Sequence, residues 1–298
     1  MVASIKELRW LIVGGEGQLG LAIQNELLTQ GINYKALGHS QLDITNEFQV
    51  SNCFEELNPE VVINTAGWTD VDGAEINEDK AWSVNAYGPQ VIAQASRKIG
   101  AKNIHISSDY VFSGTGKIPW SESANLSPLS AYGRSKAEGE KLVQHVYPDG
   151  SYVVRTAWLY SPWRKNFVKS IIKLALSTDK QVKVVIDQVG QPTNAIELAT
   201  RIREMTELNI PPGIYHGTNS GETTWFELAQ LVFKLCGEDP NRVTPITSTQ
   251  LGQLAFRPSY SVLGHQKWKE QNMNPMSDWR DALVNGIADI YSKVLLDE

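Results

Sequence analysis

Tyr132 and Lys136 are the pair of side chains in this sequence best suited to proton transfer at a carbonyl group. They stand four residues apart, which in a helix places them on one face, about one turn from each other. A phenol can donate a proton, and a nearby ammonium group favours its ionised form, so we expect Lys136 to lower the pKa of Tyr132. Because the chain contains ten tyrosines, such a pair also arises by chance and needs independent support.

A glycine-spaced turn supplies that support. It follows an apolar run over residues 8–14 and opens a helical pattern over residues 19–30. In this setting Gly14 permits the tight turn, Gly17 lets backbone N–H groups approach a pyrophosphate, and Gly20 lets the helix pack closely on the strand. An ordinary β-α turn is the alternative. We predict a dinucleotide-binding turn made of Gly14, Gly17, Gln18, Leu19 and Gly20.

A polar cluster, Ser107-Ser108-Asp109-Tyr110, ends a predicted strand over residues 103–107. In open α/β folds, ligands bind at this edge of the sheet. We therefore expect Ser108 to hydrogen-bond the substrate carbonyl oxygen, Tyr132 to donate the proton, and Lys136 to hold a nicotinamide ribose. The hydride comes from the cofactor. A serine that only caps a turn is the alternative for Ser108.

Two further pairs are candidate cofactor contacts. Asp43-Ile44 stands on a turn and is a candidate for the adenine, although Asp43 or Thr45 can equally cap a helix. Ala66-Gly67 follows the third strand and is small enough for the backbone to approach a ribose, with simple packing as the alternative. Residues 37–40, Leu-Gly-His-Ser, hold no acid for a ribose 2′-hydroxyl and no Arg for a 2′-phosphate. A missing acid removes repulsion of the phosphate, so we favour NADPH and keep NADH open.

The elements that must position these residues alternate along the first half of the chain. Strands are expected over 33–37, 60–64, 103–107 and 151–155, and helices over 47–57, 78–98 and 131–145. This alternation predicts an α/β fold, a Rossmann-type doubly wound parallel sheet covered on both faces.

The second half of the chain has a looser pattern. Helical patterns over 166–176, 195–208, 224–236 and 278–292 predict a smaller, mostly C-terminal α+β substrate lobe. Residues 213–217 are typical of a strand that returns to the main sheet. We expect a dinucleotide-binding domain over 1–155, rejoined by about 187–217, and a substrate-binding lobe mainly over 156–298.

Composition excludes several classes of protein. The 298 residues carry a net charge of -6, so there is no basic footprint for nucleic acid. No apolar stretch reaches the roughly 20 residues of a membrane span, and the N-terminus lacks the pattern of a signal peptide, so we expect a cytoplasmic protein. Cys53 and Cys236 are expected to be free thiols, and the histidine spacings predict no metal site. The oligomeric state stays open, with a homodimer as one alternative.

With these residues in place, the chain resembles the extended short-chain dehydrogenase/reductases, and most closely the dTDP-4-dehydrorhamnose reductases. The resemblance runs nearly end to end and adds four segments to the glycine turn and the Tyr-Lys pair. These are Ser107-Ser108-Asp109-Tyr110-Val111-Phe112-Ser113-Gly114, Arg155-Thr156-Ala157-Trp158-Leu159-Tyr160, Asp187-Gln188-Val189-Gly190-Gln191-Pro192-Thr193 and Arg257-Pro258-Ser259-Tyr260-Ser261.

The resemblance implies NAD(P)H-dependent reduction of the 4-keto group of dTDP-4-dehydro-β-L-rhamnose. Ser108 stands where family members often carry Thr, and it keeps the hydroxyl group. The implied contacts to this nucleotide-sugar substrate are Ser108, Asp109, Tyr110, Trp158, Asn166, Gln191 and Arg257.

There are four rival functions, and one of them, a 3,5-epimerase or synthase, would need further acid-base residues that the sequence does not reveal. A nucleotide-sugar dehydratase of the same superfamily would carry Asp-Glu after its Ser or Thr, whereas Asp109 is followed here by Tyr110, which disfavours dehydration. A reductase of another 4-keto sugar nucleotide would need the same three catalytic groups. A non-catalytic regulatory subunit resembling that of methionine adenosyltransferase is the fourth alternative, and retention of the catalytic groups favours an enzyme over it.

Overall fold

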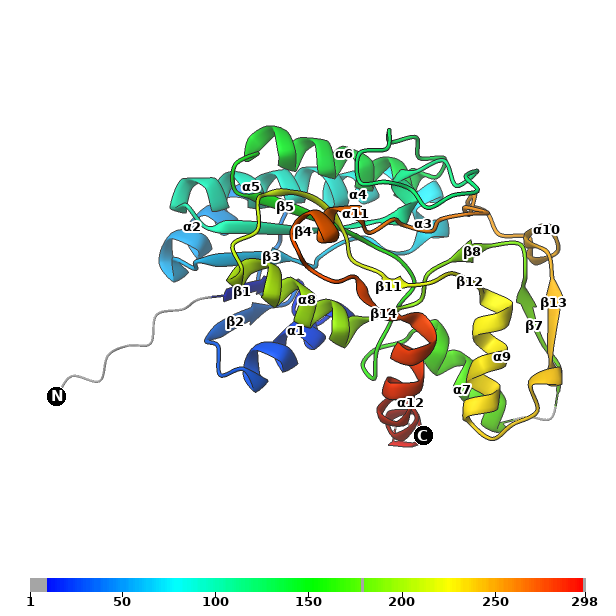
Figure 1. Cartoon of the computed structure of the whole chain (residues 1–298). Helices are drawn as coiled ribbons and strands as arrows, with labels where there is room; N and C mark the ends of the chain where they lie inside the picture. Colours follow the sequence, from blue (N-terminus) through cyan, green and yellow to red (C-terminus); the bar gives the residue numbers. More distant parts are fainter. Residues whose placement is uncertain (1–9, 178–179, 297–298) are drawn as a thin grey trace.

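A six-stranded parallel sheet forms the centre of the computed structural model, which describes residues 10–177 and 180–296 (Figure 1). Its strands lie in the order β10-β5-β4-β3-β1-β2, and each pairs in parallel with its neighbours. Their bounds are β1 Trp10–Val13, β2 Tyr34–Leu37, β3 Val61–Asn64, β4 Lys102–Ser108, β5 Ser151–Thr156 and β10 Gly213–His216. Residues 1–9 and 297–298 of the predicted domains lie outside the described residues.

Strand β1 shows how the sheet buries both of its faces. Trp10 and Ile12 belong to a core shared with α1 (Gln18–Thr29) and α8 (Ala195–Glu207). Leu11 and Val13, which point the other way, belong to a core shared with α2 (Glu47–Leu57) and α5 (Gly88–Ile99). Each aliphatic side chain fully buried in this way contributes about 1.5–3 kcal/mol. Helices therefore cover both faces, and the predicted doubly wound fold is confirmed (Figure 1).

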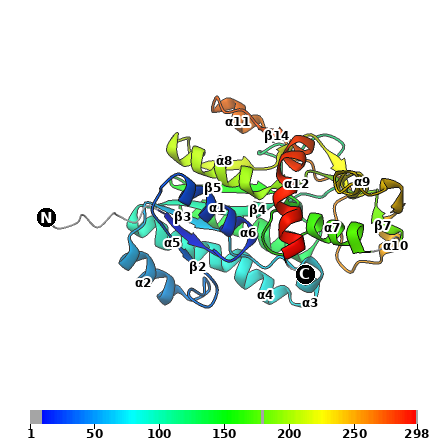
Figure 2. The ribbon, with the colours of Figure 1, turned by 90° about the horizontal axis from the view of Figure 1, so that it is seen from below.

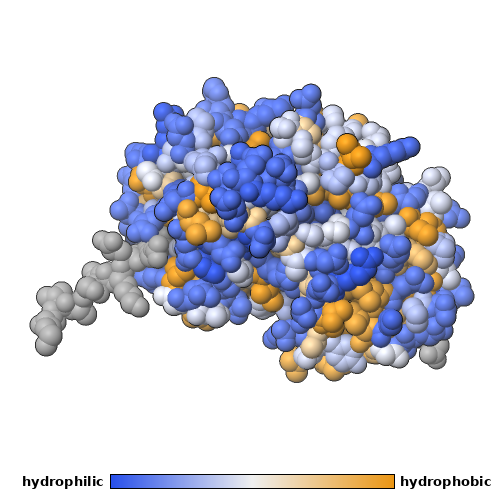
Figure 3. Space-filling view, viewed as in Figure 1, coloured by the Kyte–Doolittle hydropathy of each residue, from blue (hydrophilic) through white to orange (hydrophobic). Residues whose placement is uncertain are grey.

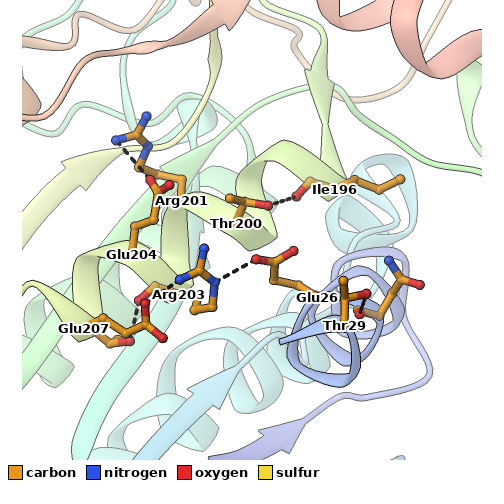
Figure 4. Close-up of polar contacts among 10 residues, drawn as sticks. Glu26, Thr29, Ile196, Thr200, Arg201, Arg203, Glu204 and Glu207 are labelled. Carbon is orange, nitrogen blue, oxygen red and sulfur yellow. Dashed lines mark hydrogen bonds and ion pairs between the residues drawn. The ribbon is translucent and has the colours of Figure 1, made fainter. Parts of the chain in front are cut away.

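Helix α8 comes from the second half of the chain but covers the same face as α1. Arg203 of α8 pairs with Glu26 of α1 at 2.7 Å and also with Glu207, one turn along its own helix (Figure 4). The strand that follows α8 is β10, which lies beside β5 at the edge of the sheet. Elements from the C-terminal half thus complete the half of the molecule that contains the main sheet.

The remaining C-terminal elements form the smaller α+β lobe, which lies at one end of the molecule (Figure 2). Its core comes from α7 (Phe167–Ser177), α9 (Trp225–Leu235), α12 (Trp279–Leu296), β7 (Val182–Val185) and β13 (Val243–Ile246). The shorter strands are β6 Leu159–Tyr160, β8 Val189–Gly190, β9 Thr193–Asn194, β11 Asn219–Ser220, β12 Thr223–Thr224 and β14 Met276–Asp278. The face of the molecule seen in Figure 3 is mostly hydrophilic, with apolar side chains gathered near α12.

Several elements differ from the sequence patterns. The helix expected over 78–98 is divided into α4 (Glu78–Trp82), a π-helix at Ser83–Tyr87, and α5. The expected helix over 131–145 is α6 (Ala131–Val146). The short helices α3 (Val71–Ile76), α10 (Ser248–Leu251) and α11 (Gln266–Glu270) had not been predicted. Within residues 10–177 and 180–296, no helix combines the length and apolar character that a membrane span requires.

Candidate active site

The glycine turn lies where the order of the strands in the sheet reverses. Strand β1 has β2 on one side and β3 on the other, and doubly wound folds bind ligands beyond the carboxyl ends of strands at such a switch point. Gly14 has a φ of 80°, and a Cβ placed on it would lie 2.5 Å from the backbone nitrogen of Ala66. Only glycine therefore fits at this position, and the loops after β1 and β3 come into close contact.

The N-terminus of α1 fits an anionic group. No side chain caps it, and its first turn contains no acid. A Cβ at Gly17 would meet only the Gly14 carbonyl oxygen, at 3.4 Å, whereas one at Gly20 would lie 2.6 Å from that oxygen. Close packing therefore requires glycine at position 20. At position 17, glycine leaves space in front of the first backbone N–H groups of α1, which have no hydrogen-bond partner within the helix. The residues present fit the pyrophosphate of a dinucleotide.

A loop of the lobe braces this turn. The Gln18 side-chain oxygen accepts hydrogen bonds from the Ser161 hydroxyl at 3.1 Å and the Asn166 amide at 3.0 Å. Arg164 donates from Nε to the carbonyl oxygen of Glu16 at 2.6 Å, and it holds a left-handed φ of 55°. Asn166, predicted to bind substrate, also accepts from the Lys169 backbone nitrogen at 3.0 Å. The spacing of Ser161 and Arg164 in the sequence gives no signal of these contacts.

Asn85 was also missed by sequence reasoning. It lies in the π-helix, is fully buried, and accepts from the Trp68 backbone nitrogen at 2.8 Å. Its amide donates to the Trp68 carbonyl oxygen at 3.0 Å and to the Ser135 hydroxyl at 3.1 Å. Asn85 therefore fastens the loop that contains Ala66 and Gly67 to α6. A π-helical turn often marks a functional site, but no residue pattern within 78–98 indicates one.

Asp43 and Ile44 have local partners. The Asp43 carboxylate accepts from the Thr45 backbone nitrogen at 2.9 Å and from its hydroxyl at 2.7 Å, and these bonds hold the pKa of Asp43 below its usual value. Ile44 is buried against α5. The local bonds of Asp43 match the alternative weighed for it, and the adenine contact stays a prediction.

The three predicted catalytic residues meet at the carboxyl end of β4. Ser108 ends this strand and donates to the Asp109 carboxylate at 2.8 Å. It is also close enough to hydrogen-bond the phenol of Tyr132. Lys136, one turn along α6 from Tyr132, donates to the Ile106 carbonyl oxygen at 2.6 Å. The structure thus places a hydroxyl and a phenol within hydrogen-bonding reach of each other, with the ammonium group one turn along α6, at the same edge of the sheet as the glycine turn.

The pKa of Tyr132 moves in the opposite direction to the one expected. Burial raises it to about 12, with a smaller contribution from the Asp109 charge, and the hydrogen bond with Ser108 only partly offsets these effects. The expected lowering by Lys136 is therefore wrong, because desolvation of the phenolate dominates. Burial also lowers the pKa of Lys136 to about 8, and the Glu140 carboxylate opposes that shift. At neutral pH both groups are mainly protonated.

Asp109 is a buried acid next to Ser108. Burial raises its pKa to about 6, against the opposing effect of nearby Ser261 and Ser108 hydroxyl groups. One carboxylate oxygen accepts from Ser108, and the other, Oδ2, is buried without a hydrogen-bond partner in the described part of the chain. A buried oxygen of this kind requires an explanation, and a water molecule or a ligand hydroxyl would supply the hydrogen bond that it lacks.

A buried ion pair holds the next turn of α6 against the sheet. Glu140, one turn beyond Lys136, accepts from Arg155 through both carboxylate oxygens, the shortest contact being 2.7 Å. Both side chains are at most 2% exposed. Ser107 donates to the same carboxylate, and Arg155 also contacts His216, whose pKa is lowered to about 3 by burial and by the Arg155 charge. His216 is therefore neutral.

Trp158 and Tyr110 have aromatic neighbours. Trp158 has a left-handed φ of 46°, a strained conformation for a tryptophan. Its ring stacks on Trp225 with centroids 3.6 Å apart, and a Cβ at Gly190 would lie 2.6 Å from it. Tyr110 meets Tyr132 edge-to-face at 5.4 Å. Strain of this kind is common at functional sites, and the stack with Trp225 holds the indole in place.

The amide of Gln191 and the guanidinium of Arg257 are engaged with the protein itself. Gln191 is 2% exposed, accepts from the Leu263 backbone nitrogen at 2.8 Å and from the Thr218 hydroxyl at 2.8 Å. Arg257 forms an ion pair with Asp72 of α3 at 2.9 Å. Gln191 therefore fixes the C-terminal segment, whereas Arg257 fastens it to α3.

Within residues 10–177 and 180–296, no group of three His, Cys, Asp or Glu side chains is arranged to hold a metal ion. Cys53 and Cys236 are free and half-buried, and burial raises the pKa of both thiols.

Comparisons with known proteins agree with this geometry. The model of the family described as the RmlD substrate binding domain matches residues 8–292. The chain is 44% identical to a dTDP-4-dehydrorhamnose reductase of Streptomyces griseus, over 93% of this chain and 92% of the relative. It is 39% identical to a dTDP-4-keto-6-deoxy-D-glucose reductase of Streptomyces niveus, over 93% of this chain and 95% of the relative.

A solved structure shows the same arrangement over nearly the whole chain. The dTDP-4-dehydrorhamnose reductase of Bacillus anthracis, in complex with NADP, is 35% identical and superposes with a TM-score of 0.91. The match covers 95% of this chain and 99% of the other. Similarity therefore extends through both the sheet and the lobe.

Proposed function

The chain belongs to the RmlD substrate-binding-domain family, and from that premise we propose that it catalyses the reaction of a dTDP-4-dehydrorhamnose reductase. The enzyme is an NAD(P)H-dependent oxidoreductase. It reduces the 4-keto group of dTDP-4-dehydro-β-L-rhamnose to a hydroxyl group and forms dTDP-L-rhamnose. The observation that supports the proposal is that Ser108 and Tyr132 lie within hydrogen-bonding reach at the carboxyl end of β4, with Lys136 one turn along α6.

The reaction adds one hydride and one proton to the ketone, and a dihydronicotinamide cofactor held at the turn of Gly14, Gly17 and Gly20 would supply the hydride. Ser108 turns its hydroxyl hydrogen from Asp109 to the ketone oxygen, which stabilises the negative charge that develops there. Tyr132, protonated at neutral pH because its pKa is about 12, gives its proton to that oxygen. The positive charge of Lys136 then stabilises the phenolate until solvent returns the proton.

The substrate contacts divide into two groups. Asp109 offers the unpartnered Oδ2 to a sugar hydroxyl, and Tyr110 and Trp158 offer aromatic surfaces to the sugar ring. Asn166 and Gln191 act as positioning residues, because their amides are engaged with Gln18 and Leu263. A homodimer and a cytoplasmic location remain predictions from the sequence.

The test is loss of NADPH and NADH absorbance when the purified protein receives dTDP-4-dehydro-6-deoxyglucose, with and without a 3,5-epimerase. Oxidation that depends on the epimerase supports the proposal. Oxidation without it would assign the activity named for the relative from Streptomyces niveus. No oxidation by folded protein that binds NADPH would favour a different ketone or a regulatory subunit.

A further inference from the structure

Residues 37–40, at the end of β2, contain no acid, although an acid at this position is the usual partner of the adenosine ribose 2′-hydroxyl in NAD-binding folds. The structure brings an acid there from another part of the chain. A Cβ placed on Gly38 would lie 2.4 Å from Cδ and 2.5 Å from Oε1 of Glu16, the residue inside the glycine turn. The Glu16 carboxyl group therefore occupies the space beside the Gly38 backbone.

The turn holds Glu16 in this position. Gly15 donates to the Leu37 carbonyl oxygen at 3.0 Å, which joins the turn to the end of β2. The Glu16 carbonyl oxygen accepts from Arg164 at 2.6 Å. Because Gly38 has no side chain, it leaves room for the carboxyl group, and any larger residue there would displace it. The two residues form a complementary pair, with the acid supplied by the turn in place of the strand end.

We propose that Glu16 is the residue that sets the relative affinity of this enzyme for NADPH and NADH. The inference rests on the proposed function only in requiring that a nicotinamide dinucleotide binds at the glycine turn. The carboxylate accepts hydrogen bonds from the 2′-hydroxyl of NADH, and it repels the 2′-phosphate of NADPH. Arg164, which binds the Glu16 backbone, offsets part of this repulsion, so NADPH is disfavoured without being excluded.

The position of Glu16 bears directly on the expected preference for NADPH. The preference for NADPH depended on the absence of an acid over residues 37–40. Glu16 supplies that acid, although it lies too far from Gly38 in the sequence for a local pattern to reveal the contact. The charge on Glu16 therefore has to be removed to learn how strongly the rest of the site favours a 2′-phosphate.

The experiment measures equilibrium binding of NADPH and NADH to the full-length protein by nicotinamide fluorescence, without sugar substrate. Glu16→Gln keeps the shape of the side chain and removes its charge. We expect its affinity for NADPH relative to NADH to rise about tenfold, equivalent to about 1.4 kcal/mol. The difference from wild type should shrink as ionic strength rises, because Glu16 is exposed. Glu56→Gln, another exposed acid, is the matched control and should leave the ratio unchanged.

Adenosine 2′,5′-bisphosphate and 5′-AMP, used as competing probes, isolate the effect of the 2′-phosphate. Glu16→Gln should bind the bisphosphate more tightly and 5′-AMP no better. Equal weakening of both cofactors would overturn the inference, because Glu16 would then only shape the turn. An unchanged ratio would also overturn it while leaving the proposed function intact. Failure of folded wild-type protein to bind either cofactor would overturn the proposed function and this inference together.

Discussion

Among single residues, Tyr132 has the most direct role in the proposed chemistry. Tyr132→Phe removes the proton donor but keeps the ring that packs against Tyr110. Loss of a general acid lowers turnover by about 10²–10⁴-fold, so we expect kcat to fall in that range while the Kd for NADPH changes little. Steady-state rates and fluorescence binding measure the two quantities. Tyr147→Phe, outside the site, is the control, and near-normal turnover in Tyr132→Phe would refute the role.

Asp109 should show a trade-off between stability and activity. Its pKa rises from 3.8 unfolded to about 6 folded, because the charged form is buried. Between these two pH values the folded state keeps a proton that the unfolded state has lost, so stability falls as pH rises, and the full cost persists above pH 6. We expect Asp109→Asn to raise the free energy of unfolding by about 1–3 kcal/mol at pH 7, and to lower turnover.

Urea denaturation of wild type and Asp109→Asn at pH 7 and pH 4 measures the effect. The increase in the free energy of unfolding should disappear near pH 4, where the wild-type carboxyl group is protonated in the folded state. An equal gain at both pH values would mean that the charge of Asp109 is not its cause.

Ser108, Tyr132 and Lys136 could be predicted from the sequence, because their side-chain chemistry and the spacing of Tyr132 and Lys136 are both visible in it. The structure places all three near the carboxyl end of β4. Sequence reasoning misjudged the pKa of Tyr132, because the desolvation that raises the pKa depends on tertiary burial. It also missed Glu16 beside Gly38, a contact between neighbouring loops that no local spacing encodes.

At the scale of elements, two glycines at the N-terminus of α1 have different roles, one in cofactor binding and one in stability. Gly17 has an ordinary φ of -76°, and a Cβ there meets only one atom at 3.4 Å. Gly17→Ala should therefore fold with near wild-type stability but lose NADPH affinity by about tenfold or more, because the methyl group stands where a phosphate approaches. Thermal unfolding and fluorescence binding give the two readouts.

Gly20→Ala is the contrasting variant, since its Cβ would lie 2.6 Å from the Gly14 carbonyl oxygen. Overpacking of this kind costs about 1–3 kcal/mol, so this variant should lose stability. Unchanged NADPH affinity in folded Gly17→Ala would count against the phosphate-binding role of the turn.

The alternation of strands and helices was predictable, because buried strands and amphipathic helices leave different periodicities in the sequence. The π-helix at Ser83–Tyr87 was not, since one wider turn barely disturbs an apolar pattern. Two-residue strands such as β6 and β9 are too short to show any period, and their pairing depends on the tertiary fold.

At the scale of the whole molecule, the C-terminal half returns twice to the nucleotide-binding half. Helix α8 and β10 join the main sheet, and the segment around residues 255–263 crosses back to α3 and Gln191. The segment that forms α8 and β10 shows a strand pattern over 213–217 in the sequence, whereas residues 255–263 form no helix or named strand. Individual polar contacts hold this second segment, and a sequence does not reveal which partners such contacts join.

The Asp72–Arg257 ion pair is the clearest of these contacts. Asp72 also accepts from the Ala255 backbone nitrogen at 2.8 Å, and the charges of Asp72 and Arg257 both act on Tyr110. Asp72 thus orients an arginine beside the proposed sugar site. Asp72→Asn should raise the KM for the nucleotide-sugar by about three- to tenfold and leave kcat and NADPH binding nearly unchanged, the pattern of a lost binding contact.

Stability should change by less than about 1 kcal/mol, because partly exposed ion pairs contribute little. The side chains of Arg257 and Asp72 are 14% and 40% exposed, and those of Arg242 and Glu238, in the lobe, are 12% and 36% exposed. Glu238→Gln is therefore a matched control that removes a similar pair away from the site. A comparable rise in KM in that control would show that general loosening, and not the orientation of Arg257, is responsible. An unchanged KM in Asp72→Asn would remove Arg257 from the substrate contacts.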